Sequence, residues 1–285
     1  MSVSSFRACL PLILLLCAPA ALVHAQLSKI FVASTGNDAN DGSRGSPKRN
    51  FQGAHDAVVA GGQIVVLDTA GYGALNITKS LAVTVPPGVN GFVTVTGTTN
   101  GITVNATAAN VALRGLIIEG GGLGGGGTGI SATTLSFLFL EDCTVRNFSI
   151  GFAFFVNSPA NLYMRNCVVR SCNSGMEVRP SSAVTNVAGI IDCRFEQNSS
   201  FGVIASTNGN GSNIDMTLEG CFVAGNNTGV QASASNSVIR VSNSTIINNA
   251  SGIAAFATGQ VLSRGNNTLE KNAALNGFPA TYSAK

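Results

Sequence analysis

The chain has 285 residues, of which 45% are hydrophobic and 10% are charged, and its formal net charge is +3. A disordered chain would be less hydrophobic and more highly charged, so this composition excludes disorder and fits a folded protein. The basic residues are scattered, with no run longer than Lys48-Arg49, which argues against nucleic acid as a partner.

Residues 1–25 have the pattern of a secretory signal peptide. Arg7 precedes an apolar run at 8–22 that is too short to span a bilayer, and Val23-His24-Ala25 offers a cleavage site after Ala25. No second long apolar run follows in the sequence. We therefore predict an exported protein, periplasmic or extracellular, that has no membrane contact after the signal is removed.

Residues 26–63 differ from the rest of the chain. A strand pattern at 29–34 is followed by a polar, turn-rich loop at 35–48. Over 51–60 the apolar residues recur at helical spacing, and Gly61-Gly62 ends the pattern. Because a stack of strand-built coils exposes apolar side chains at its end, we predict that this short helix is a cap.

Residues 64–285 contain a repeat. Glycines that each open an alternating apolar segment recur at intervals of 22 to 28 residues, at Gly101, Gly129, Gly151, Gly175, Gly202, Gly229 and Gly252. A period of this length indicates a solenoid. Within each unit the apolar residues alternate with a period of two, which is typical of strands with one buried face. The predicted fold is therefore an all-β, single-stranded right-handed parallel β-helix with a short N-terminal capping α-helix.

Four cysteines occupy the same place in four successive units: Cys143, Cys167, Cys193 and Cys221. We interpret them as an interior ladder of small residues, with Gly115 and Ser244 at the same place on either side. Their side chains would point in the same direction, which argues against a metal site. Disulfide bonds between neighbouring coils stay open as an alternative, and the state of Cys172 is open as well.

The sequence resembles a known family at both ends. FVASTGNDANDGS (31–43) and the following cap segment look like the start of bacterial exported right-handed parallel β-helix proteins of the pectate-lyase-like superfamily, and SRGNNTLEKN (263–272) looks like their last coil. The resemblance implies the β-helix fold. It does not imply one activity, because that superfamily includes lyases, hydrolases, epimerases and adhesins.

Few residues have the pattern of a chemical site. Of the outward positions on the glycine-led strands, only Glu177 and Arg179 carry charges, and Phe155 offers a ring one coil earlier. A lone carboxylate neither holds calcium nor supplies the two carboxyls of a glycosidase. His55, the one histidine after residue 25, falls on the predicted cap, where packing explains it. We therefore predict no catalytic constellation, no metal site and no cofactor.

Two columns of polar residues are predicted to have structural roles. Asp142, Asn166 and Asp192 precede the ladder cysteines, and we expect them to bond backbone N–H groups at a corner of the coil. Arg146 and Arg170 are expected to stack beside Glu196 on a solvated face.

The functional prediction follows from these observations. We expect a non-catalytic surface module that binds a carbohydrate or another ligand, such as a polysaccharide, through Glu177, Arg179 and Phe155. The alternative is a polysaccharide lyase or a related carbohydrate-active enzyme of the pectate-lyase-like superfamily.

Overall fold

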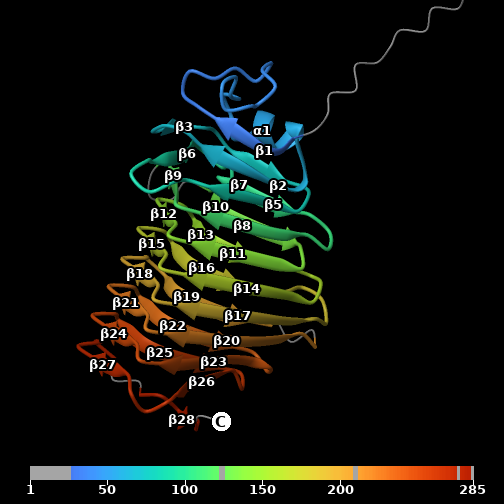
Figure 1. The fold of residues 1–285 in the computed structure, drawn as a ribbon. Coiled ribbons are helices and arrows are strands. Elements are labelled where there is room, and N and C mark those ends of the chain that lie inside the picture. Colours follow the sequence, from blue (N-terminus) through green and yellow to red (C-terminus); the bar gives the residue numbers. More distant parts are fainter. Residues whose placement is uncertain (1–26, 122–125, 208–210, 275–276, 284–285) are drawn as a thin grey trace, which may run out of the picture.

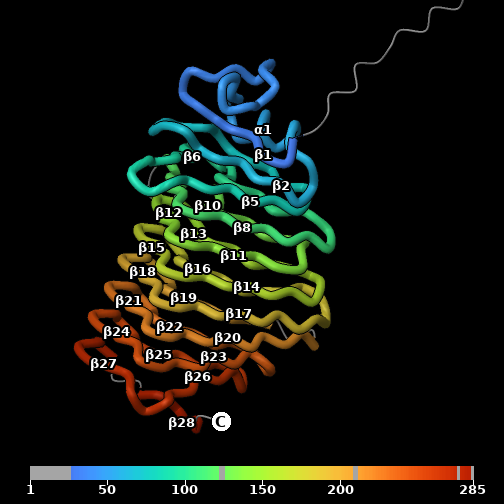
Figure 2. The backbone as a smooth tube through the Cα atoms, in the orientation of Figure 1, coloured from blue at the N-terminus to red at the C-terminus, as the bar shows by residue number. Residues whose placement is uncertain are grey.

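The protein is a right-handed parallel β-helix built of three sheets (Figures 1 and 2), and its computed structural model describes residues 27–121, 126–207, 211–274 and 277–283. The predicted signal peptide lies outside the described residues. Within them, no helix is long and apolar enough to cross a membrane.

Each coil contributes one strand to each sheet in turn. Sheet I has eleven strands: β1 (Leu27–Val32), β2 (Val58–Val66), β5 (Leu81–Thr84), β8 (Asn110–Arg114), β11 (Phe137–Glu141), β14 (Ala160–Arg165), β17 (Thr185–Ile191), β20 (Asn213–Glu219), β23 (Ser237–Ser242), β26 (Gln260–Ser263) and β28 (Ala280–Thr281).

Sheet II has nine strands: β3 (Ala70–Gly71), β6 (Gly91–Val95), β9 (Leu116–Gly120), β12 (Thr144–Arg146), β15 (Val168–Arg170), β18 (Arg194–Glu196), β21 (Phe222–Ala224), β24 (Thr245–Ile247) and β27 (Thr268–Glu270). Sheet III has eight: β4 (Leu75–Ile77), β7 (Ile102–Asn105), β10 (Thr128–Thr134), β13 (Ile150–Phe154), β16 (Ser174–Val178), β19 (Phe201–Ser206), β22 (Thr228–Ser233) and β25 (Ser251–Phe256).

The core runs along the axis of the coil, enclosed by the three sheets. In β14, for example, Leu162 and Met164 point inward and are buried, whereas Asn161 and Arg165 point outward and are exposed. The period of two predicted from the sequence is therefore the alternation between core and surface. All the paired strands are parallel, because the rest of each coil serves as the crossover that parallel strands require.

Two tight corners join sheet I to sheet II and sheet II to sheet III. At each corner one residue has a positive φ, a conformation that asparagine, aspartate and glycine adopt at low cost. The first corner uses Gly115, Asp142, Asn166, Asp192, Gly220 and Asn243, and the second uses Asn147, Ser171, Gln197, Gly225, Asn248 and Lys271. Seven of these twelve corner residues are asparagine or glycine, so the turning of the chain accounts for part of the asparagine and glycine in the sequence.

Two pairs of side chains at the first corner bond to each other. Asn166 donates its amide to Asp142 at 2.7 Å, and Asn266 donates to Asn243 at 2.7 Å. Asp142 and Asn166 thus bond each other's side chains and not the backbone N–H groups that were predicted as their partners. A bond of the predicted kind is formed further along the same column, where Asn266 accepts the N–H of Asn243 at 3.2 Å.

The cysteine ladder is confirmed with one correction. All five cysteines of the described chain are free and buried, and burial is the main cause that raises the pKa of Cys172 to about 11 and that of Cys221 to about 12. Ser244 continues the ladder as predicted, because Thr245 pairs with Phe222. Gly115 does not: since Ile117 pairs with Thr144, Leu116 stands beside Cys143, and Gly115 is the corner residue beside Asp142.

A second buried ladder, of asparagines, follows the second corner. Asn226 accepts bonds at its side-chain oxygen from the backbone N–H and the amide of Asn198, both at 3.0 Å. Asn249 accepts the same pair of bonds from Asn226 at 2.9 Å, and Asn272 accepts the same pair from Asn249 at 3.0 Å. Each asparagine therefore satisfies the polar groups of its neighbour inside an apolar core.

The cap helix α1 (Phe51–Ala57) is shorter than predicted, because Val58 already begins strand β2. Leu27 of β1 pairs with Val58, and this pairing prevails over the helical pattern of the sequence. Sheet I also continues across the predicted boundary at residue 63, since β2 pairs with β5 through Gly62 to Val65.

The helix is docked on the first coil. Phe51 and Ala54 are buried, and the ring centroids of Phe51 and Tyr72 are 5.1 Å apart. His55 is buried too, and its Nε2 accepts the backbone N–H of Thr78 at 3.2 Å, so this histidine packs the cap as expected. The adjacent loop is tied by Asp38, whose carboxylate accepts the backbone N–H groups of Arg49 and Asn50.

Changing Ala54 to Asp should destabilise the protein by about 3 kcal/mol or more, because an unpaired charge would be buried under the cap. Ala60→Asp is the matched control: Ala60 is exposed just beyond the helix, and its change should cost no more than about 0.5 kcal/mol. Chemical denaturation of both variants measures the difference. Equal stabilities would show that the helix is not docked.

Removing one step of the asparagine ladder should also be costly. Asn226→Ala leaves the buried amide groups of Asn198 without their acceptor, and we expect a loss of about 2–4 kcal/mol in the free energy of unfolding. Asn227→Ala changes the neighbouring exposed asparagine and should be nearly neutral. A similar small effect from both substitutions in urea denaturation would contradict a stabilising role for the ladder.

Candidate functional site

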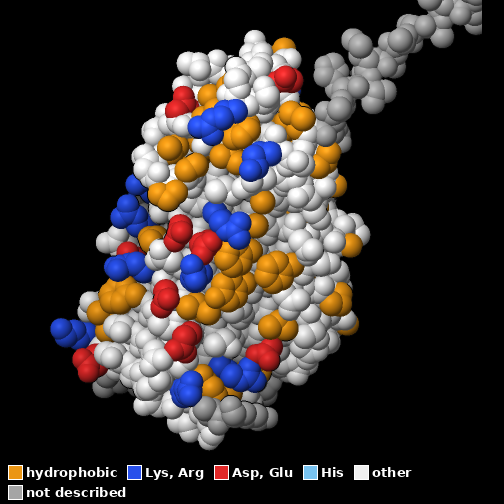
Figure 3. Space-filling model, in the orientation of Figure 1, with side chains coloured by type: hydrophobic (Ala, Val, Ile, Leu, Met, Phe, Trp, Pro, Cys, Tyr) orange, Lys and Arg blue, Asp and Glu red, His pale blue; other side chains and the backbone are white. Residues whose placement is uncertain are grey.

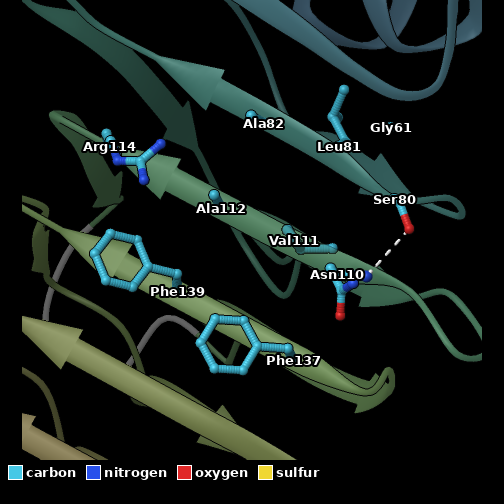
Figure 4. A pocket seen from close by; sticks show the side chains of 10 residues that line it. All are labelled: Gly61, Ser80, Leu81, Ala82, Asn110, Val111, Ala112, Arg114, Phe137 and Phe139. Carbon is cyan, nitrogen blue, oxygen red and sulfur yellow. Dashed lines mark hydrogen bonds between the residues drawn. The ribbon is translucent and has the colours of Figure 1, made fainter.

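The outer face of sheet I carries a shallow groove near its N-terminal end. The groove has a volume of about 580 Å³ and lies across β5, β8 and β11, with Gly61 of β2 at its margin (Figure 4). Its floor is low because outward positions on β5 and β8 hold the small residues Ala82 and Ala112, which pair with each other. In the next coil the residue that pairs with Ala112 is Phe139, so a large ring stands beside the two small side chains.

The aromatic side chains form the wall of this groove. Phe137 and Phe139 project from β11, as Figure 4 shows, and Phe137 is 37% exposed. The ring of Phe139 stacks on that of Tyr163 of β14, with centroids 5.3 Å apart and planes 4° from parallel. Gly189 follows Tyr163 in register, so this end of the stack has no further side chain.

A row of charges runs beside the rings, towards the ends of the strands. Glu141 bridges two arginines: its carboxylate lies 3.0 Å from Nε of Arg114 and 2.6 Å from Nη2 of Arg165. The guanidinium of Arg114 also lies over the ring of Phe139, 4.9 Å from its centroid. The three charges sum to +1. Because Glu141 holds both guanidinium groups in place, this rim offers hydrogen-bond donors at fixed positions.

Figure 3 shows the result on the molecular surface. Hydrophobic side chains gather on the middle of the face formed by sheet I, and acidic and basic side chains lie along one side of them. Val187 of β17 is 44% exposed and continues the hydrophobic area. Asn161 of β14 lies between Val187 and Phe137 in register. The arrangement suits a ligand with both apolar faces and hydroxyl groups.

The residues predicted as a ligand site lie on a different sheet. Glu177 and Arg179 belong to the coil of β16 on sheet III, and Nη2 of Arg179 lies 3.2 Å from a carboxylate oxygen of Glu177. Phe155, one coil earlier, follows Phe154, the register partner of Val178. The structure thus brings the three residues together, although Glu177 is only 6% exposed. Ligand binding there stays a prediction.

The face of sheet I was not among the sites predicted from the sequence. Its signal was present: in LFLE and LYMR the residues Phe139 and Tyr163 occupy the outward positions of a period-two pattern. The site prediction rested on the glycine-led strands, which form sheet III. Among the described residues, no group of three or more His, Cys, Asp or Glu side chains converges as metal ligands would.

Comparison with known proteins supports the fold. The family model described as "right handed beta helix region" matches residues 88–215. The crystal structure of pectate lyase Pel9A superposes with a TM-score of 0.61 at 14% identity, over 82% of this chain and 67% of that chain. A rhamnogalacturonan lyase superposes with a TM-score of 0.53, also at 14% identity, over 82% of this chain and 72% of that one. No curated protein matches the chain.

The chain therefore has the pectate-lyase-like right-handed β-helix fold, as the resemblance at its two ends predicted. At this level of identity the likeness concerns the fold. The bacterial origin implied by the same resemblance stays a prediction.

Proposed function

We propose that this protein binds a polysaccharide across the outer face of sheet I. The observation that carries the proposal is the stacked pair of Phe139 and Tyr163 at the side of an open groove, with Arg114, Glu141 and Arg165 along its rim. Solvent-facing rings of this kind contribute nothing to the core, which is already filled by the inward residues of the same strands.

The chemistry of a sugar chain matches these groups. A sugar ring has apolar C–H faces and polar hydroxyl edges. The C–H faces pack against aromatic rings, whose negative π-surface attracts them, while arginine and glutamate side chains bond the hydroxyls. Phe137 and Phe139 lie on one strand, β11, so a chain of several sugars that runs parallel to this strand would contact the two rings in succession.

The structural relatives support a role in polysaccharide chemistry, because one is named as a pectate lyase and the other as a rhamnogalacturonan lyase. They equally support the alternative, an enzyme of that class. The prediction of a non-catalytic module receives no support from them and stays a prediction.

The groove itself favours binding over elimination chemistry. A lyase needs a base that removes a proton from the sugar. Arg114 and Arg165 are both held by Glu141 in ion pairs, and a paired guanidinium donates hydrogen bonds but does not accept a proton.

Affinity electrophoresis against a set of soluble neutral and acidic polysaccharides tests the proposal. The protein should be retarded by at least one of them, and the double variant Phe139→Ala, Tyr163→Ala should bind that polysaccharide about 10-fold or more weakly, because two stacking surfaces are lost.

Phe222→Ala is the matched control for this experiment. Phe222 lies on sheet II beneath Arg194, whose guanidinium is 4.9 Å from its ring centroid, the same separation as between Arg114 and Phe139. Binding that is weakened equally by the control, or unaffected by the double variant, would contradict the assignment to sheet I.

We also predict no calcium-dependent cleavage of polyuronates. Incubation with pectate or alginate, with and without calcium, should give no rise in absorbance from an unsaturated product. Calcium-dependent turnover would support the alternative. Its loss in Glu177→Ala or Arg179→Ala would place the chemistry on sheet III, and its loss in Glu141→Gln would place it in the groove on sheet I.

A further inference from the structure

The outer face of sheet II carries a second hollow, at the corner where the chain turns towards sheet III. It has a volume of about 320 Å³ and is lined by Arg170, Glu196, Gln197, Ala224, Gly225 and Asn248. These residues come from four successive coils, whose sheet II strands are β15, β18, β21 and β24 (Figure 1). This corner pocket lies on another sheet from the groove described above.

Small residues create the corner pocket. Ala224 pairs in register with Glu196, and Gly225 follows it at the corner, so two adjacent positions lack long side chains. A Cβ placed on Gly225 would lie 3.6 Å from Cγ of Gln197, in the space that the glycine leaves open. The neighbouring coils on both sides carry longer side chains, which form the walls.

The charges around the pocket are unequally paired. In register, Glu119, Arg146, Arg170 and Glu196 form one column, so two ion pairs are expected. The first is formed, with Arg146 Nη2 at 2.9 Å from Glu119. The second is not: Glu196 accepts instead from Nε of Arg194 on its own strand, at 3.0 Å.

Arg170 is left as a cation without a partner. Its guanidinium makes no ion pair or hydrogen bond with any residue in the described part of the chain, and it stands in register beside a second arginine, Arg146. Like charges at directly paired positions are unfavourable. The other charges form two neutral pairs, so the surroundings of the pocket carry a net charge of +1.

Two amides complete the lining. The side chains of Gln197 and Asn248 both belong to corner residues with positive φ and are exposed to solvent. Neither side chain makes a hydrogen bond within the described residues, so both are available as donors.

We propose that the corner pocket binds a small oxyanion, a carboxylate, sulfate or phosphate group, through the guanidinium of Arg170. The planar fork of arginine donates two parallel bonds to such a group, and the amides of Gln197 and Asn248 supply further donors. The sequence predicted only a solvated face here, formed by Arg146, Arg170 and Glu196. The pairing of Glu196 with Arg194 accounts for the difference, because it leaves Arg170 without an acid although the register places the two residues side by side.

Thermal unfolding in sodium sulfate, phosphate or acetate, at constant ionic strength maintained with chloride, tests the proposal. At least one anion should raise the melting temperature with a saturable dependence and a dissociation constant on the order of 1 mM. Comparison of the three salts identifies which oxyanion geometry is preferred.

Three variants distinguish a built pocket from a general attraction of anions. Arg170→Gln and Ala224→Leu should each weaken the response at least 10-fold, the first by removing the cation and the second by filling the hollow with the charge unchanged. Arg264→Gln is the control, because Arg264 is exposed and forms no ion pair within the described residues. This change should leave the response to the anion unchanged. An unchanged response in Arg170→Gln, or in a folded Ala224→Leu, would overturn the proposal, as would the absence of a saturable effect in the wild-type protein.

Discussion

Backbone hydrogen bonding between successive coils is the constraint on which every other feature of this protein depends. Neighbouring parallel strands lie about 4.8 Å apart, and the register is continuous through most of each sheet. Any side chain therefore lies directly against the side chain at the same position of the next coil. A residue type whose side chains attract one another can be repeated as a ladder. A residue type whose side chains repel one another destabilises the place where two copies stand side by side.

Inside the coil this constraint is used favourably. Asparagine is both donor and acceptor, so Asn198, Asn226 and Asn249 each bond to the next without leaving a buried amide unsatisfied. The cysteines form the other ladder because a thiol is small and weakly polar, and burial stabilises its neutral form. On the outside the same geometry produces the two surfaces proposed as sites. It stacks the rings of Phe139 and Tyr163, and it places Arg146 beside Arg170, whose neighbouring acid Glu196 pairs with Arg194 instead.

The repeat itself was readable from the chain. The repeating glycines open the strands of sheet III, where in most coils a Cβ would meet a backbone oxygen of the next coil. Asparagines mark corners that need unusual backbone angles, and alternation marks the buried face. Their spacing can be read directly from the sequence. The parallel β-helix, the helical cap and the cysteine ladder followed from them. Two details did not: the end of the helix at Ala57 and the place of Gly115. Both depend on which residue pairs with which in the neighbouring coil.

The candidate site was less predictable for the same reason. Phe139 and Tyr163 are 24 residues apart, and Phe139 and Arg114 are 25 apart. Their contacts exist because each coil brings its strand back into register with the strand before it, although the coils differ in length. Glu177 shows the converse: its position in a period-two pattern indicates an exposed side chain, whereas the packing of the whole molecule buries it. Periodicity and corner chemistry are properties of residues close together in the chain, while the pairing of distant charges and rings depends on how far each coil travels before it comes back beside the last one.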